Sequence, residues 1–132
     1  MSEENVEIVR RFFQESDSEM DVVSQLWASD LDYRAIEGAP DDVGVFHGHE
    51  ALRHYYQQWY ETFDDFGVEA EVLTEAGEKV VAAVYISGRM RNGGARIDMR
   101  LGIVFTLRNG EIISGREFAT RELALEAAGL SE

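Results

Sequence analysis

The sequence predicts an α+β fold, in which helices in the first half of the chain pack on an antiparallel sheet formed by the second half. Apolar residues recur at helical spacing up to about residue 63, and from about residue 66 onward apolar and polar residues alternate. Short sequences rich in Gly and Asn divide the second half into four long stretches. With 132 residues, the chain has room for one domain with one core.

Three helices and a short strand are expected before the sheet. The first helix opens the chain, and a shorter one follows Asp21. Residues 31–36 alternate as a short strand would, and residues 37–48 form a loop rich in Gly, Asp and Pro. The third helix covers residues 49–63, where aromatic residues recur at spacings of three and four. The apolar faces of the first two helices consist of Val6, Val9, Phe12, Phe13, Val22, Val23, Leu26 and Trp27.

Four long strands joined by tight turns follow as a meander. The strands begin near residues 66, 79, 97 and 111, and turn sequences stand at residues 76–77, 92–94 and 109–110. A short helix over residues 121–128 then ends at Gly129. Because a long twisted sheet curls, helices fill only part of its concave side, and a pocket is expected between the third helix and the sheet.

The composition narrows the classes of partner and compartment. The chain has 26 acidic and 12 basic residues and a formal charge of -14, and such a field repels nucleic acids and anionic membrane surfaces. Cysteine is absent from the sequence, which excludes disulfides, thiolate metal sites and a cysteine nucleophile. The start lacks a basic segment followed by an apolar one, and no apolar run is long enough to span a bilayer. We therefore expect a cytoplasmic protein that binds neither nucleic acid nor membrane.

Several stretches of the chain resemble a known family. They are Phe-His-Gly-His-Glu-Ala-Leu at 46–52, Asp-Met-Arg at 98–100, Phe-Thr-Leu-Arg-Asn-Gly at 105–110, Arg-Glu-Phe at 116–118, and residues 123–130. Together they make the chain, as a single domain over residues 1–132, similar to the SnoaL-like polyketide cyclase group of the nuclear transport factor 2-like superfamily. The resemblance implies a cone-shaped α+β fold, with three N-terminal helices packed on a curled four-stranded antiparallel meander plus a short strand. Because this fold hosts several activities, the function depends on individual residues.

Glu117 is the principal catalytic candidate. The resemblance implies that the acidic residue of the 116–118 stretch lies on the last strand and faces the pocket. Alternation agrees, because it places Glu117 on the same face as Gly115 and Ala119. A carboxylate removed from water in such a place has a raised pKa and can transfer a proton near neutral pH. The alternative is a glutamate that is exposed or paired with an arginine.

Tyr33, His47 and His49 are the candidate hydrogen-bond donors beside this carboxylate. The two histidines flank Gly48 just before the third helix, at a position that the resemblance assigns to the pocket mouth. A histidine titrates near neutral pH and can act as an acid or a base, whereas the alternative is a surface or helix-cap role. The spacing disfavours a metal site formed with Glu50. We therefore expect neither a metal nor a cofactor.

Aromatic and apolar residues supply the expected pocket wall. As a group they suit a planar apolar ligand, although each ring can equally pack in the core. The candidates are Trp27, Tyr55, Tyr56, Trp59, Phe63, Tyr85, Met99 and Phe105. A small apolar molecule is therefore the expected partner.

Two chemistries of this superfamily lack their residues in the sequence. The resemblance implies that epoxide hydrolysis requires an Arg and an Asp two residues apart on the central strand, but residues 84–88 contain neither. Arg96 and Asp98 have that spacing on the next strand, where we expect surface charges. The resemblance implies that ketosteroid isomerase-like chemistry requires a tyrosine on the first helix and a general-base carboxylate after it. The sequence has Phe12 at the first position and Arg34 close to the second, so both roles are missing.

The sequence leaves two hypotheses about function. The first is a cofactor-independent cyclase or isomerase that transfers a proton on a small apolar carbonyl compound, with Glu117 as the acid or base. The second is a non-catalytic ligand-binding or dimerisation domain of the same fold. In either case we expect a homodimer through the sheet face turned away from the helices, where residues such as Val104 and Thr106 would meet a partner sheet.

Overall fold

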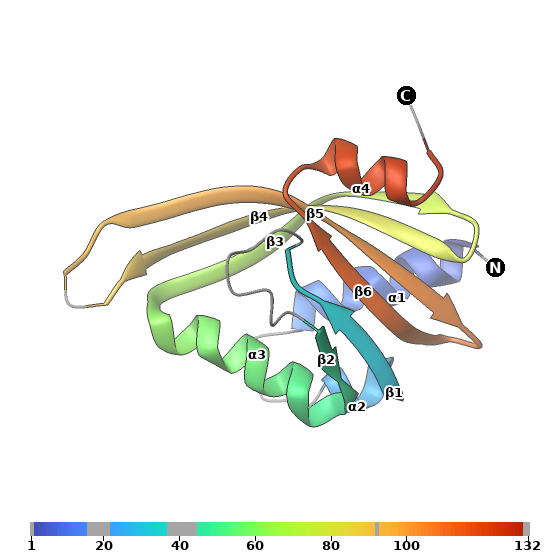
Figure 1. Cartoon of the computed structure of the whole chain (residues 1–132), viewed down its shortest axis with the longest axis horizontal. Helices are drawn as coiled ribbons and strands as arrows, with labels where there is room; N and C mark the ends of the chain where they lie inside the picture. Colours follow the sequence, from blue (N-terminus) through green and yellow to red (C-terminus); the bar gives the residue numbers. More distant parts are fainter. Residues whose placement is uncertain (1, 16–21, 37–44, 92, 131–132) are drawn as a thin grey trace.

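A curled sheet, to which the described residues contribute six strands, forms the centre of the molecule (Figure 1). This computed structural model describes residues 2–15, 22–36, 45–91 and 93–130. The strands follow the order β2-β1-β6-β5-β4-β3, with β1 parallel to β6 and every other neighbouring pair antiparallel. They are β1 (Trp27–Arg34), β2 (Val45–His47), β3 (Phe63–Ala76), β4 (Lys79–Met90), β5 (Arg96–Arg108) and β6 (Glu111–Phe118).

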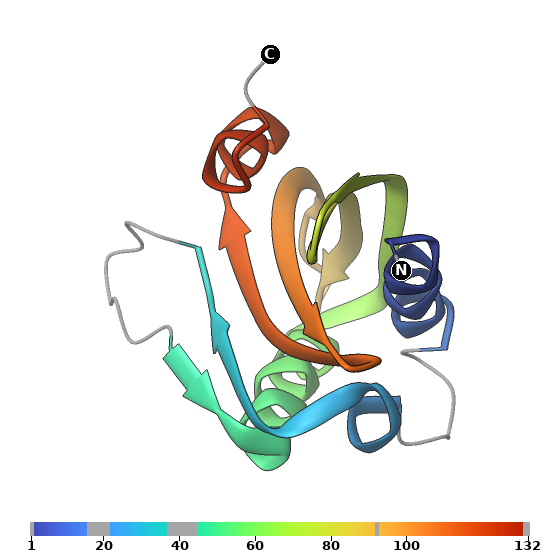
Figure 2. The same ribbon diagram turned by 90° about the vertical axis from the view of Figure 1, so that its right-hand side faces the viewer.

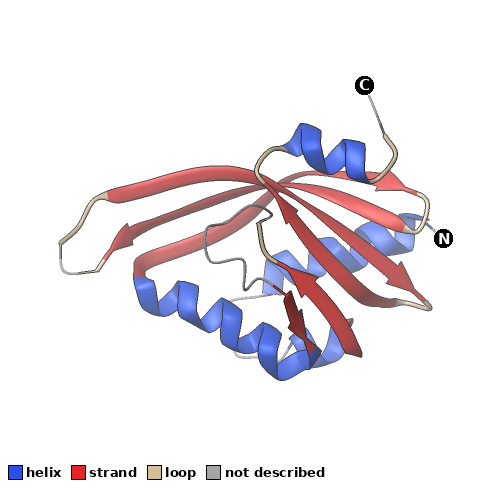
Figure 3. Ribbon diagram, viewed as in Figure 1, coloured by secondary structure: helices blue, strands red, loops and turns tan. Residues whose placement is uncertain are grey.

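Helices pack on both faces of the sheet (Figures 2 and 3). The concave face carries α1 (Ser2–Glu15), α2 (Val22–Leu26) and α3 (Gly48–Thr62), and the opposite face carries α4 (Arg121–Ala127). The main core lies under the first three helices and includes Val9, Phe12, Leu26, Leu52, Ile103 and Phe105. In the part of the chain that the structure describes, no helix is both long and apolar enough to cross a membrane.

The meander β3–β6 confirms the four long strands that alternation predicts. Its turns use residues that tolerate a left-handed backbone, since φ is 65° at Gly77, 55° at Asn109 and 81° at Gly110. Helix α3 begins and ends one residue before the expected bounds of 49–63.

The N-terminal strands differ from the expectation of one short strand at residues 31–36. Strand β1 begins at Trp27, which was expected at the end of the second helix, and it pairs in parallel with β6. Strand β2 lies in a segment expected to be loop, because three residues are too short to give a period-two signal. Residues 37–44 of that loop, and Asp21, lie outside the described residues. Within the described ranges, the sheet is therefore mixed and six-stranded, and it is not closed into a barrel.

Helix α4 covers an apolar cluster on the outer sheet face. Residues alternate along β5, so that Ile103 faces the main core whereas Val104 packs with Val81, Phe118 and α4. The helix is capped at its start by Thr120, whose hydroxyl accepts a hydrogen bond from the backbone of Leu123. Val104, which was expected to meet a partner sheet, is thus buried by the chain's own helix.

Gly115 allows two large rings to lie directly on β6. A Cβ atom at this position would lie 2.7 Å from the Tyr33 ring and 3.1 Å from the Trp27 ring. Real Cβ atoms do not approach other heavy atoms as closely as the first of these distances. Tyr33, which pairs with Gly115 across the parallel β1–β6 ladder, therefore keeps its position only if residue 115 is glycine.

We expect Gly115→Ala to lower the free energy of unfolding by about 1–3 kcal/mol, because the added methyl group overpacks a filled core. Gly67→Ala on β3 is the matched control, since its Cβ would meet only Ser87 Oγ at 3.6 Å, an ordinary contact. That control should change the stability by no more than about 0.5 kcal/mol. Urea denaturation measures both variants, and equal effects would contradict the close approach at Gly115.

Candidate functional site

The carboxyl group of Glu117 is buried inside the main core. Its side chain is 6% exposed, and no other charged residue in the described ranges is buried to this degree. It lies next to the end of β6 and pairs with Ile103 of β5, so both side chains point to the concave face. The sequence alternative of an exposed or arginine-paired Glu117 does not fit this burial or the partners of the carboxylate.

Neutral donors from separate elements hold the carboxylate. The Tyr33 hydroxyl on β1 donates to Oε2 at 2.5 Å. The Tyr55 hydroxyl on α3 lies 3.1 Å from Oε1 and 3.0 Å from Oε2. The backbone N–H of Ile36, just beyond β1, is a further donor. A carboxylate has about four lone-pair sites, so these three donors leave room for one more proton or donor.

Burial controls the protonation of this group. Removal from water raises the pKa of Glu117 above its usual value of 4.5, and the donors Tyr33, Tyr55 and Ile36 lower it in part. Burial also raises the pKa of Tyr33, Tyr55 and Tyr56, and the charge of Glu117 raises each of them further. The tyrosines therefore stay protonated and act as donors at neutral pH.

A small cavity adjoins Glu117. It has a volume of about 20 Å³, which is room for about one water molecule. Its walls come from α1, α3 and strands β1 and β3–β6, and they are apolar or aromatic except for Tyr33, Tyr56 and Glu117. The pocket expected between the third helix and the sheet is thus largely filled by aromatic side chains.

Among the expected wall residues, those of α3 lie closest to the carboxyl group. Tyr56 and Trp59 line the cavity, and Tyr55 reaches Glu117 itself. Phe63 does not line the cavity but stacks on Trp59, with ring centroids 5.7 Å apart.

The remaining expected wall residues lie farther from the cavity. Trp27 and Phe105 are buried behind it, with ring centroids 6.0 Å apart, and Met99 packs at the edge of the same core. Tyr85 lies on the other face of the sheet, because its neighbours Val84 and Ile86 are the residues of β4 that line the cavity.

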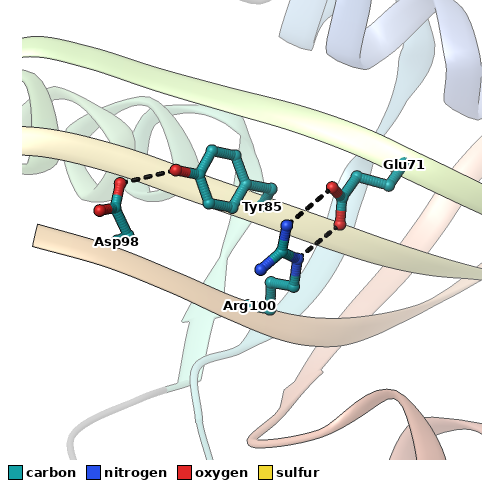
Figure 4. A network of polar contacts seen from close by, with 4 residues as sticks. All are labelled: Glu71, Tyr85, Asp98 and Arg100. Carbon is teal, nitrogen blue, oxygen red and sulfur yellow. Dashed lines mark hydrogen bonds and ion pairs between the residues drawn. The ribbon is translucent and has the colours of Figure 1, made fainter.

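The outer face carries a second pair of tyrosine and carboxylate (Figure 4). The Tyr85 hydroxyl donates to Asp98 Oδ1 at 2.6 Å. The guanidinium of Arg100 lies 4.7 Å from the centre of the Tyr85 ring and donates to both oxygens of Glu71 at 2.9 and 3.2 Å. Asp98 and Arg96, 3.7 Å apart as an ion pair, are thus surface charges, as expected from alternation.

His47 and His49 turn toward other partners. The His47 ring is 72% exposed and its Nδ1 pairs with Asp32 on the neighbouring strand. The Nε2 atom of His49 lies 2.8 Å from the backbone oxygen of Trp27. The structure therefore turns both rings toward partners other than Glu117.

Several residues of the site were not singled out from the sequence. They are Phe13, Phe66, Val68, Val84, Ile86, Leu101 and Ile103 in the cavity wall, and Ile36 as a backbone donor. Alternation along β4 and β5 identifies the inward-facing residues, but it does not distinguish those beside a cavity from those in solid core. The Ile36 contact is made by the backbone and leaves no signal in the residue type.

The comparisons place the chain in a family. Residues 9–115 match the SnoaL-like domain family, and the chain therefore belongs to it. A candidate SnoaL-like polyketide cyclase from Jannaschia sp. CCS1 is 25% identical, with a TM-score of 0.76 over 99% of this chain and 94% of that chain.

More distant solved structures share the fold. TerC, co-crystallised with polyporic acid, is 13% identical, with a TM-score of 0.75 over 96% of this chain and 98% of that chain. Bal32a, from a soil-derived mobile gene cassette, is 23% identical, with a TM-score of 0.76 and 88% of both chains covered. These two likenesses show the shared fold alone. No curated protein matches the sequence.

We expect the stability of the protein to respond to pH through Glu117. The pKa of this group is higher in the folded chain than its usual 4.5, so between these two values the folded chain holds more protons than the unfolded one. We compare the free energy of unfolding of the unaltered protein with that of Glu117→Gln, which cannot titrate at this position. The unaltered protein should lose stability relative to the variant as the pH rises from 4.5 through the folded-state pKa. Urea denaturation across this pH range measures the difference, and a difference that does not change with pH would contradict the raised pKa.

Proposed function

We propose that the protein is a cofactor-independent cyclase or isomerase that transfers a proton on a small apolar carbonyl compound. The buried Glu117 carboxyl group, which faces the cavity and is held by neutral tyrosine donors, is the observation that carries this proposal. Its raised pKa brings it closer to neutral pH, where a general base or acid works best. The likeness to the candidate polyketide cyclase from Jannaschia, and to TerC with its polyporic acid, supports a small organic substrate.

In this proposal the Glu117 carboxylate takes the proton from the carbon next to the ligand's carbonyl group. The electron pair of the broken C–H bond forms an enolate, whose oxygen accepts a hydrogen bond from the Tyr56 hydroxyl in the cavity wall. The carboxyl group then returns the proton, to another carbon in an isomerisation, or to the new alkoxide after the enolate carbon has attacked a second carbonyl.

Tyr33 and Tyr55 act as positioning residues for Glu117. Both donate to the carboxylate, so they fix its direction and stabilise its charge before the substrate proton arrives. The proposal gives the donor roles to tyrosines rather than to His47 and His49, because these rings are turned toward Asp32 and Trp27.

The alternative is a non-catalytic ligand-binding domain of the same family. The small volume of the cavity favours this alternative, because a cavity of about 20 Å³ is almost filled by the protein's own side chains. In that case the two tyrosines and Glu117 would serve to fix the packing of β1 and α3 against β6.

Exchange of carbon-bound protons tests the proposal. We expect the protein to accelerate deuterium exchange at the activated carbon of 2-tetralone, a neutral bicyclic ketone, as measured by proton NMR in heavy water. Glu117→Gln should slow this exchange by at least about 100-fold, because the amide cannot accept the proton.

Asp98→Asn is the matched control for this experiment. It removes a carboxylate that also accepts from a tyrosine, at 2.6 Å, but on the exposed face of the sheet. The control should exchange 2-tetralone at the unaltered rate. Equal rates for Glu117→Gln and the unaltered protein would contradict the proposed base, and binding of 2-tetralone without exchange would favour the non-catalytic alternative.

We also propose that two copies associate through the part of the outer sheet face that α4 leaves uncovered. Val72 of β3 is 47% exposed there. The charges of Arg100 and Glu71 beside it cancel, so this surface avoids the repulsion between two chains of formal charge -14.

Sedimentation velocity tests this association, and we expect a dimer at micromolar concentration. Val72→Asp should yield monomers, whereas Val45→Asp, at a site on β2 that is 42% exposed, should not. A monomeric unaltered protein would contradict the dimer.

A further inference from the structure

The cavity beside Glu117 is too small for the substrate that we propose. Ligand sites for small organic molecules have volumes of about 300–1,000 Å³, whereas this cavity has about 20 Å³. A carbonyl compound with even one ring therefore needs space that a neighbouring part of the molecule must supply.

A wide groove lies beside the cavity, between α1 and the edge strand β3. Its volume is about 420 Å³, and both elements contribute residues to its walls. Figure 2 shows α1 lying along β3 at the side of the sheet. Arg10 and Gln14 line it on the helix, and Glu69 and Ala70 line it on the strand. The groove alone is large enough for a molecule of two or three rings.

Phe13 and Val68 separate the groove from the cavity. These two residues line both spaces, so the spaces are neighbours with a shared wall. Val68 belongs to the β3–β4 ladder, where it pairs with Ile86, and its branched side chain has little rotamer freedom. Phe13 is only half-buried and lies in the last turn of α1, with its ring centroid 5.7 Å from that of Phe105. Of the two, Phe13 is the side chain that can change rotamer without moving the sheet.

A second wide groove offers no comparable route. It has a volume of about 480 Å³ beside α4, and Val84 and Leu101 border both this groove and the cavity. These two residues pair with each other across the β4–β5 ladder, and their side chains are buried toward the main core. The groove therefore lies on the outer face, and the backbone of the sheet separates it from Glu117.

We infer that the groove between α1 and β3 is the outer compartment of the ligand site, and that Phe13 is the side chain that closes the inner one. The inference rests on the proposed function. When the Phe13 ring turns away from β3, the cavity and the groove become one space that extends from Glu117 to the surface. The ligand is a neutral, elongated, planar molecule, with its reacting ring beside Glu117 and its hydrogen-bonding groups in the groove.

The charges of the groove support an uncharged ligand. Among the described residues of its walls, the two acidic residues Glu69 and Glu71 outnumber one cation, Arg10. Arg10 is paired with Glu7 at 2.6 Å, and Glu71 is paired with Arg100. An anionic ligand would thus gain no net attraction, whereas amide and guanidinium donors at Gln14 and Arg10 can bind hydroxyl or carbonyl oxygens of a neutral molecule.

Thiol labelling tests the route without any ligand or activity. Because the sequence has no cysteine, Ile103→Cys places one thiol in the wall of the inner cavity. Its reaction with methyl methanethiosulfonate, a small neutral reagent, reports access to that cavity. We expect Phe13→Ala, added to Ile103→Cys, to raise the labelling rate at least about tenfold, because local opening no longer has to displace a ring.

Phe66→Ala is the matched control for the route. Phe66 lines the inner cavity but not the groove, so its removal should raise the rate far less than Phe13→Ala. Val81→Cys, buried under α4 away from the cavity, reports global opening and should label at the same slow rate in each background. An equal or faster rate with Phe66→Ala, or an equal acceleration of Val81→Cys labelling, would overturn the assignment of Phe13.

A binding experiment tests the outer compartment. The probe is 2-naphthol, a neutral planar phenol, whose own fluorescence reports binding. Ala70→Phe fills the groove, and we expect it to weaken binding at least about tenfold. Ala83→Phe makes the same change in the groove beside α4, and it should leave the affinity within about twofold. Equal effects of the two variants would overturn the assignment of the outer compartment. If 2-naphthoate binds as tightly as 2-naphthol, the assignment of a neutral ligand is wrong.

These outcomes are separable from those of the proposed function. If Glu117→Gln abolishes exchange while Ala70→Phe and Phe13→Ala have no effect, Glu117 is the base and the ligand enters elsewhere. If the labelling result holds but no exchange occurs, the compartment exists in a protein that binds without catalysis. If 2-naphthol binds none of the proteins, the ligand class is wrong.

Discussion

The structure depends on the burial of one carboxyl group. Moving an ionised carboxylate from water into an apolar core is unfavourable by several kcal/mol unless hydrogen bonds replace the lost water. Glu117 receives these bonds from Tyr33, Tyr55 and the backbone of Ile36. Each donor requires a feature of the fold. Tyr33 depends on the parallel pairing of β1 with β6, and Tyr55 depends on the packing of α3 against β1. The Ile36 donor depends on the path of the chain just beyond β1. The small residue at position 115 lets the first of these donors approach.

The two faces of the sheet hold the same chemical pair in different surroundings. Tyr33 with Glu117 is buried, whereas Tyr85 with Asp98 is exposed to solvent. Water competes for every group of the exposed pair, so that pair contributes little to stability. In the buried pair the same contact determines where a proton resides. Burial, rather than residue type, therefore distinguishes a candidate site from a surface hydrogen bond.

Patterns between near neighbours in the chain were readable from the sequence. Alternation and turn residues predicted β3 to β6, aromatic spacing predicted α3, and the 116–118 stretch indicated Glu117 on the inward face. The pairing of β1 with β6 was not readable, because it joins distant segments and leaves no periodic signal. Nor could residue type reveal that Tyr85 faces outward or that the His47 ring turns to Asp32, since both depend on strand register.

The parallel β1–β6 pairing also bears on how the protein folds. The hairpins of the meander pair residues that are near each other in the sequence, so they form quickly. The hydrogen bond from Tyr33 to Glu117, in contrast, spans 84 positions. During synthesis the aromatic faces of α1 and α3 leave the ribosome long before β6 can cover them. Recovery of the hydrogen bond at Glu117 should thus mark the final stage of refolding, after the meander β3–β6 has formed and β1 has paired with β6.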